Sequence, residues 1–151
     1  MGKIKRIVIH CTATRAGEEV TKEALHKLFF DTNGWKHWGY HILVHLNGSI
    51  EELQPLPQPQ EDGGYITDAT LANGAKGYNW DSVHIAYVGG LDRASRKPAD
   101  TRTEAQKQVL WKIVAKLKVD YKVNDVVGHY QLPGVKKDCP CFDAKYTYRN
   151  A

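Results

Sequence analysis

The chain has 151 residues, of which 42% are hydrophobic and 25% charged, and a formal net charge of +4. This length is enough for one domain with its own core, and the composition is that of a globular protein, so we expect residues 1–151 to form a single, monomeric domain. No apolar run approaches the roughly 20 residues that span a bilayer, and no clustered basic patch is present, so neither a membrane nor a nucleic-acid partner is expected.

The N-terminal part is predicted to form a buried strand over Lys5–Cys11 and a helix over Thr21–Phe30. The apolar run of the strand reaches its end at His10. One face of the helix carries Leu25, Leu28 and Phe29. The basic segment before the strand is followed by too few apolar residues for a signal peptide, so we expect synthesis in the cytoplasm without one.

A β-hairpin is the strongest local signal in the chain. Asn47-Gly48 is a favoured turn pair, and it joins a strand-like run over Tyr40–Leu46 to a second run over Ser49–Leu53. Alternation places four residues of the first run on one side, namely Tyr40, Ile42, Val44 and Leu46. His41 and His45 fall on the other side, and we interpret them as structural histidines rather than ligands.

The middle of the chain is predicted to be dominated by a long surface loop. Residues 54–79 are rich in proline and glycine, with one short helix expected around Asp68–Ala72. A central strand over Val83–Val88 and an exposed, charged connection over Leu91–Thr101 should follow.

The C-terminal part is predicted to contain the longest helix. Thr103 and Gln106 form a capping box that opens it. Its apolar stripe has helical spacing and comprises Val109, Leu110, Ile113, Val114 and Leu117. A last strand over Val123–Val127 leads to Gly128-His129. Strands interleaved with helices predict an α/β protein in which helices flank a mixed central β-sheet.

Three side chains combine the right chemistry for a catalytic metal. His10 ends the first strand, and His129 and Cys139 follow the last strand within eleven residues of each other. Two imidazoles and a thiolate are ligands with which a catalytic zinc ion keeps a fourth position open for water. Other interpretations stay open: a structural His10, and thiols at Cys139 and Cys141 that are inert, redox-active or part of a structural zinc site.

Nine segments, in this order, resemble the motifs of the type 2 N-acetylmuramoyl-L-alanine amidases. They are Val8–Ala13, Gly34-Trp35, Trp38–Ile42, Asn47-Gly48, Lys76–Asn79, Asp81–Val83, Val88–Asp92, Gly128-His129 and Lys137–Asp143. Among these enzymes the chain resembles most the small phage-encoded amidases historically called lysozymes, to which the peptidoglycan-recognition proteins are also similar. The resemblance implies the fold of this group, with a zinc ion at the floor of an open groove.

The resemblance also implies roles for single residues. One zinc ion per chain is held by His10, His129 and Cys139. Tyr40 and Lys137 are catalytic. Cys141 is the one competitor for Cys139, and the Cys-Pro step followed by Phe142-Asp143 favours Cys139. Cys11 points away from His10 in the strand and is interpreted as buried packing.

Two departures from the family pattern concern residues other than the implied ligands. Relatives often carry a histidine where this chain has Gly74, and many carry an arginine near the position of Gln54. These departures put substrate contacts and rate in doubt more than the reaction itself.

The resemblance implies zinc-dependent hydrolysis of the amide between N-acetylmuramic acid and L-alanine in peptidoglycan. Without a signal or a wall-binding domain, we expect a phage or prophage endolysin that acts on the cell wall after release. A non-catalytic peptidoglycan-recognition module is an alternative, although such modules commonly lose the ligand that Cys139 supplies. A regulatory role on a phage partner protein stays open as well.

Overall fold

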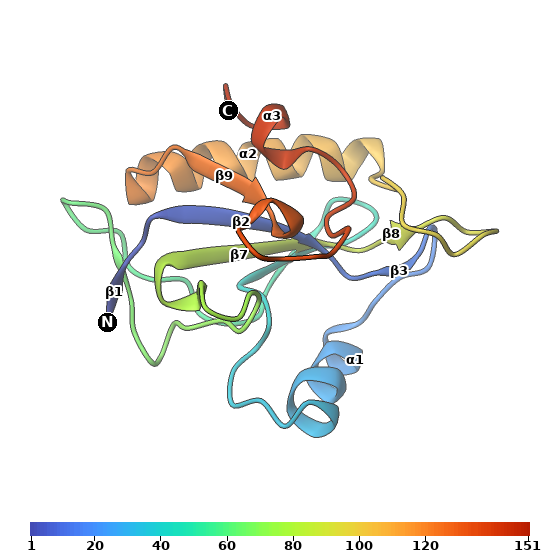
Figure 1. Ribbon diagram of the computed structural model, residues 1–151, viewed down its shortest axis with the longest axis horizontal. Coiled ribbons are helices and arrows are strands. Elements are labelled where there is room, and N and C mark those ends of the chain that lie inside the picture. The colour runs from blue at the N-terminus through green and yellow to red at the C-terminus, as the bar shows by residue number, and fades with distance from the viewer.

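A five-stranded sheet forms the centre of the computed structural model, which describes residues 1–151 (Figure 1). Its strand order is β5-β4-β7-β2-β9, with β2 at Arg6–Cys11, β4 at Ile42–Val44, β5 at Ile50–Glu52, β7 at Ser82–Tyr87 and β9 at Asp125–Gly128. Neighbouring strands are parallel, except that β4 and β5 pair antiparallel. The predicted α/β class with a mixed sheet is confirmed.

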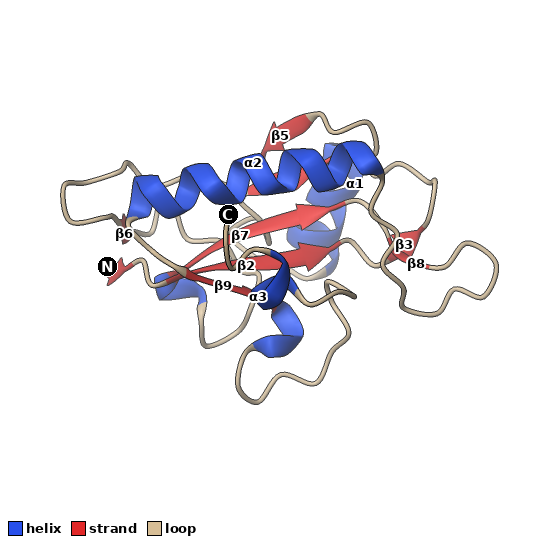
Figure 2. Cartoon of the chain, turned by 90° about the horizontal axis from the view of Figure 1, so that it is seen from above, coloured by secondary structure: helices blue, strands red, loops and turns tan.

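Helix α2 (Glu104–Tyr121) lies along one face of this sheet (Figures 1 and 2). The predicted capping box is present, because Gln106 N–H donates to the Thr103 hydroxyl and Thr103 N–H donates to the Gln106 side chain. The buried apolar residues of the helix pack on alternate strand residues in one core, which includes Ile7, Ile9, Ile42, Val83, Ile85, Leu110, Val114 and Leu117. Burial of each such side chain contributes roughly 1.5–3 kcal/mol.

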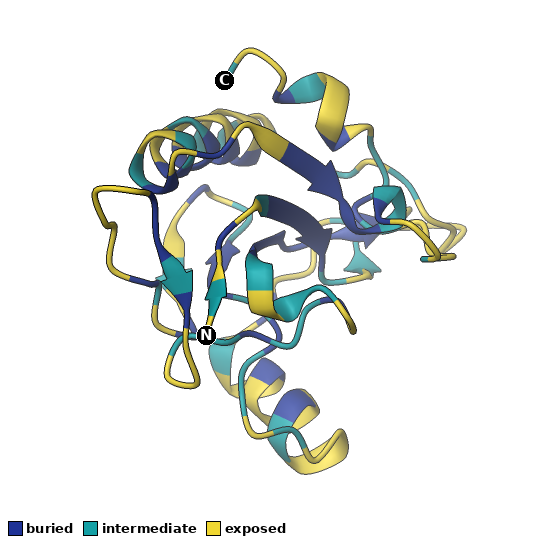
Figure 3. Ribbon diagram, turned by 60° about the vertical axis from the view of Figure 1, so that its left-hand side comes forward, coloured by how far each residue is buried: buried dark blue, intermediate teal, exposed yellow.

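The opposite face is covered in part by helix α1 (Lys22–His26), which continues as a π-helical segment, η1 (Lys27–Thr32). Thr21 caps α1 by accepting from Ala24 N–H. Leu25 and Phe29 are buried, as expected, whereas Leu28 is 44% exposed. The expectation for Leu28 was wrong because i→i+5 bonding puts more residues into each turn and rotates this side chain outward. Figure 3 shows the exposed outer side of this helix.

The predicted hairpin is formed by β4 and β5. Gly48 N–H donates to His45 O and His45 N–H donates to Ser49 O, so Leu46 and Asn47 are the central turn residues. Gly48 follows with φ of 87°. The turn therefore lies one residue earlier than Asn47-Gly48, with glycine at the left-handed position of a longer hairpin loop.

The long connection over residues 54–79 contains one short strand. This strand, β6 (Tyr65–Ile66), pairs antiparallel with β1 (Gly2–Lys3). The helix expected around Asp68–Ala72 is absent, because residues 68–70 form a turn in which Thr70 N–H donates to Thr67 O. Turns of this kind satisfy local backbone groups without the repeated bonding that a helix needs.

The remaining elements are short. They are β3 (Thr14–Arg15), η2 (Asn79–Asp81), β8 (Gly90–Leu91), η3 (His129–Gln131) and α3 (Ala144–Thr147). Strand β9 begins two residues later than predicted, since Lys122, Val123 and Asn124 form the connection between it and α2. None of the helices combines the length and the apolar composition needed to cross a membrane.

Candidate metal centre and groove

His10 faces the side of the sheet that lies opposite α2. Alternation along β2 directs Ile7, Ile9 and Cys11 into the core beneath α2, so that Cys11 is buried packing as expected. His10 therefore points the other way, and its side chain is only 2% exposed. Its position near the carboxyl end of a parallel strand is typical of ligand sites in open α/β sheets.

Strand β9 brings His129 beside His10. The parallel register aligns Ile9 with Gly128. His10 directly follows Ile9, and His129 directly follows Gly128. The two imidazole ring centroids lie 4.7 Å apart, and the ring planes are inclined by 65° to each other. Residues far apart in the sequence thus place two imidazoles at one end of adjacent strands.

Cys139 reaches the same place from the loop before α3. Its Sγ accepts a hydrogen bond from Cys11 N–H at 3.2 Å and lies 3.7 Å from His10 Nδ1. The ligand atoms of His10, His129 and Cys139 all lie within 4.8 Å of one another and could hold a metal ion. A sulfur and a nitrogen on a tetrahedral zinc ion lie ~3.6 Å apart, so the donor set and spacing fit zinc.

Cys141 does not join this group. Its thiol is directed to Gly90 O at 3.4 Å, and the side chain packs against the core beneath α2. Burial raises the pKa of the Cys141 thiol to about 12, which keeps it protonated at neutral pH. Of the two cysteines considered from the sequence, Cys139 is therefore the one beside the imidazoles.

Both imidazoles of the group are neutral at neutral pH. Burial, followed by the charges of His129 and Lys137, lowers the pKa of His10 well below its ordinary value. Burial and the Lys137 charge lower the pKa of His129 to about 4. A metal ligand must offer a free lone pair, and neutral imidazoles do so.

Tyr40 lies against His10, with ring centroids 5.3 Å apart. Its hydroxyl donates to Cys11 O at 3.4 Å, and burial raises its pKa so that it stays protonated. The tyrosine packs with Phe29 and Leu43 rather than with Ile42 and Val44 as alternation predicted. That expectation was wrong because β4 begins only at Ile42, so the two-residue period does not reach back to Tyr40.

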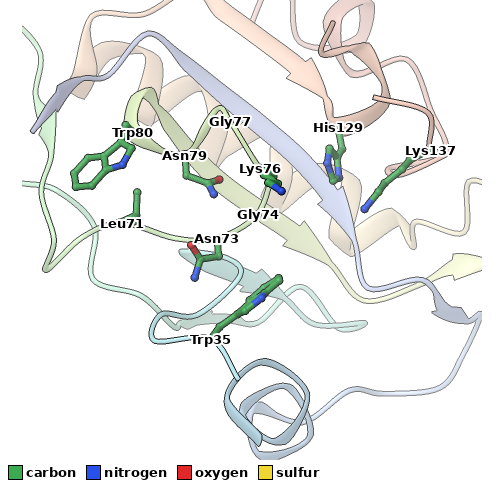
Figure 4. Close-up of a pocket in the computed structure, with 10 residues that line it drawn as sticks. All are labelled: Trp35, Leu71, Asn73, Gly74, Lys76, Gly77, Asn79, Trp80, His129 and Lys137. Carbon is green, nitrogen blue, oxygen red and sulfur yellow. The ribbon is translucent and has the colours of Figure 1, made fainter. Parts of the chain in front are cut away.

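A groove runs past the three residues. One cavity of about 240 Å³ contains all of His10, Tyr40, His129, Lys137 and Cys139 in its lining. A second cavity, of about 500 Å³, extends toward Leu71 and Trp80. The residues that line both cavities are Trp35, Asn73, Gly74, His129 and Lys137. Figure 4 shows exposed Lys137 next to His129 at one end, Trp80 at the other, and Trp35 on the side of α1.

The two histidines of the hairpin region have structural partners, as expected. His41 is fully buried, where its Nε2 donates to Thr70 O at 2.6 Å and its Nδ1 accepts from His84 N–H at 3.0 Å. His45 contacts Glu19 and Glu51 with its two ring nitrogens, at 2.7 and 2.8 Å. Neither residue lines the groove.

His84 is a residue at the site that the sequence interpretation missed. It lies on β7, and its Nδ1 is 2.8 Å from His10 Nε2. A histidine within the apolar run Val83–Val88, which was predicted to form a central strand, was a usable signal, since a buried imidazole needs a polar partner. Which strands pair is not encoded in such a run alone, however.

The structure gives each departure from the family pattern a physical setting. Gln54 lies away from the groove lining, where it accepts from Trp38 N–H and donates to Ala69 O, so it ties two loops together. Gly74 lines the groove beside His84, and a Cβ at this position would lie 2.5 Å from His84 Nδ1. Only glycine fits while His84 keeps this place.

Comparison with known proteins finds a matching family and similar sequences. The family model described as N-acetylmuramoyl-L-alanine amidase matches residues 1–142. An endolysin of Klebsiella phage KP32 is 32% identical over 140 residues, which is 93% of this chain and 82% of that protein.

Solved structures share the fold at lower identity. The N-acetylmuramoyl-L-alanine amidase LysC from Clostridium intestinale superposes with a TM-score of 0.71 at 19% identity, over 96% of this chain and 81% of that one. Bumblebee PGRP-SA also superposes with a TM-score of 0.71 at 19% identity, over 99% of this chain and 83% of that one. The fold is thus common to amidases and to proteins of the PGRP group.

Proposed function

The chain belongs to the N-acetylmuramoyl-L-alanine amidase family, and from this premise we propose that it uses one zinc ion to hydrolyse the amide between N-acetylmuramic acid and L-alanine in peptidoglycan. The observation that carries the zinc assignment is the convergence of His10, His129 and Cys139, whose donor atoms lie within 4.8 Å of one another. Zinc at such a site, when bound, supplies a Lewis acid and activates water near neutral pH.

Tyr40 and Lys137 are proposed to stabilise the negative charge that develops on the amide oxygen. Tyr40 is held against His10, and its raised pKa keeps the hydroxyl as a hydrogen-bond donor. Lys137 lines the cavity that contains the three proposed ligands. Each donor aimed at a developing oxyanion contributes roughly 3 kcal/mol to catalysis.

The groove is proposed to bind a glycan strand and its peptide stem. Trp35 and Trp80 offer aromatic faces to apolar parts of the substrate, and Lys76 and Lys137 offer ammonium groups to peptide carboxylates. The two cavities share five lining residues and so form one continuous groove, which suits a polymer that binds along its length.

The phage relative suggests the biological setting. We propose that this protein is an endolysin that acts as a monomer on the cell wall, with residues 1–151 forming its catalytic domain. The product of such an enzyme is a glycan with a free lactyl carboxylate and a peptide with a free alanine amino group.

Digestion of purified peptidoglycan, followed by mass spectrometry, tests this proposal. Zinc-loaded protein should release peptides that begin with alanine, chelation should abolish release, and added zinc should restore it. Retention of muropeptide without cleavage by the zinc-loaded protein would instead identify a recognition module. Cleavage that persists after complete removal of zinc would refute the metal assignment.

A further inference from the structure

A second imidazole lies directly behind the proposed ligand His10. His84, on the neighbouring strand β7, is completely buried, and its Nδ1 lies 2.8 Å from His10 Nε2. Its other ring nitrogen, Nε2, lies 3.0 Å from Asn79 Oδ1. No part of the proposed reaction uses His84, yet it occupies a buried place that an apolar residue would fill at lower cost.

One backbone group determines the direction of the hydrogen bonds that link His10, His84 and Asn79. Ala75 N–H can only donate, and it donates to Asn79 Oδ1 at 2.9 Å, which fixes the orientation of the amide. Because Oδ1 only accepts, His84 Nε2 must be the donor to it. In a neutral His84 the Nδ1 atom is then the acceptor, and His10 Nε2 must carry the proton that it receives.

These hydrogen bonds determine which nitrogen of His10 has a lone pair available for a metal ion. With its Nε2 protonated, His10 has its lone pair on Nδ1, the atom that faces Cys139 Sγ at 3.7 Å. We propose that His84 is a positioning residue, which fixes the tautomer and ring orientation of His10 for metal binding. The inference rests on the proposed zinc function and deepens it, since such outer contacts orient metal ligands and raise their affinity.

His84 is itself held from two sides. Its backbone N–H donates to His41 Nδ1, and its ring stacks parallel to that of His41 with centroids 6.1 Å apart. On the groove side, Gly74 leaves room for it, since a Cβ there would lie 2.5 Å from Nδ1 and 2.7 Å from Cγ. The glycine at position 74 and the histidine at position 84 therefore form one unit.

The test compares zinc affinity in three variants by competition with a chromophoric chelator. His84→Leu removes the acceptor and should weaken zinc binding by about 10- to 100-fold. His84→Asn returns an oxygen near the place of Nδ1 and should recover most of the loss. His45→Gln, at a histidine whose ring contacts Glu19 and Glu51 and neither His10 nor His84, should leave zinc affinity within about threefold of wild type.

Two outcomes of this comparison contradict the role of His84. Unchanged zinc affinity in His84→Leu would do so, as would an equal loss of zinc affinity in His45→Gln. If the wild-type protein binds no zinc, the proposed function itself is wrong. If the wild type binds zinc and His84→Leu binds it equally tightly, only the positioning role of His84 is wrong.

Ring ¹⁵N shifts of histidine-labelled, zinc-loaded wild type test the same inference without any substitution. They should show His84 and His10 protonated on Nε2, and protonation of His84 on Nδ1 would overturn the proposal.

Gly74→Ala supplies an independent check on the link between the glycine and the histidine. Because its Cβ would lie 2.5 Å from His84 Nδ1 and 2.8 Å from the backbone Gly39 O, this variant displaces the His84 ring and should lose at least as much zinc affinity as His84→Leu. The double variant should then lose no more zinc affinity than Gly74→Ala alone, since the loss through His84 is already included in that variant. Losses that add in the double variant would contradict the proposed unit.

Discussion

Alternate residues of β2 and β7 face opposite sides of the sheet, and the two sides are held together differently. Toward α2, residues such as Ile7, Ile9 and Ile85 join one continuous apolar core. On the groove side, His10 and His84 from the same strands are buried with directed hydrogen bonds as their polar contacts. Apolar packing stabilises without fixing direction, whereas hydrogen bonds aim particular atoms, so substitutions on the two sides should separate stability from chemistry.

The largest effect is expected from loss of a proposed ligand on the groove side. His129→Ala should lose zinc and at least about 1000-fold of the amidase rate, because a catalytic metal contributes several kcal/mol to the transition state. Metal analysis and peptide release measure both. Stoichiometric zinc in His129→Ala, with its activity retained, would remove this residue from the site.

Removal of one hydroxyl on the same side should have the next largest effect. Tyr40→Phe keeps the ring against His10, so zinc content should be unchanged, while kcat falls by about 100- to 1000-fold. Lys137→Met should behave similarly. Turnover near that of wild type in Tyr40→Phe would show that the hydroxyl has no part in catalysis, and loss of zinc would give the residue a structural role.

The α2 side should respond in the opposite manner. Leu110 is completely buried in the apolar core, and Leu110→Ala should lower the free energy of unfolding by about 3 kcal/mol through lost burial and the cavity left behind. At temperatures where the variant is folded, its kcat should match that of wild type. Denaturant unfolding and peptide release separate the two quantities, and a kcat loss as large as that of Tyr40→Phe would break the division between the faces.

Periodic apolar patterns predicted most of the fold, because burial on one face repeats along the sequence. Helix α2, its capping box and the strands of the sheet were predictable for this reason. The turn of the hairpin and the side taken by Tyr40 were not, since β4 covers only Ile42–Val44 and its two-residue period extends neither to Tyr40 nor to the turn. Leu28 was misplaced by the π-helical segment, whose period differs from 3.6.

The candidate site divides in the same way. The proposed ligands could be named from motif resemblance, as could Tyr40 and Lys137. His84 could not, because its role depends on which strand lies beside β2 and on the space that Gly74 leaves. Hydrogen-bond partners of this kind arise from tertiary pairing and leave no periodic signal.

The smallest predicted effect concerns His45, which contrasts with the groove-side imidazoles. Burial lowers the pKa of His45, but hydrogen bonds to Glu19 and Glu51 outweigh it and leave the pKa above its ordinary value. The stabilisation that this gives is present below the unfolded pKa of about 6.5 and is lost as pH rises through the folded pKa. The pKa of Glu19 is lowered, so the stabilisation that its carboxylate contributes is lost only as pH falls through that lower pKa.

His45→Gln should therefore lower stability by about 1 kcal/mol near pH 5.5, the size of a partly exposed ion pair, and by less above pH 8. Denaturant titrations of both proteins at the two pH values measure the difference. A larger loss at the higher pH would mean that the neutral imidazole, rather than the charged one, stabilises the hairpin.

X-ray absorption at the zinc edge tests the central assignment most directly. Zinc-loaded wild type should show one sulfur neighbour at about 2.3 Å and nitrogen neighbours at about 2.0 Å. The sulfur signal should vanish in Cys139→Ser and persist in Cys141→Ser, because only Cys139 lies beside His10 and His129. A sulfur neighbour that survives in Cys139→Ser, or a wild-type spectrum without sulfur, would contradict the account.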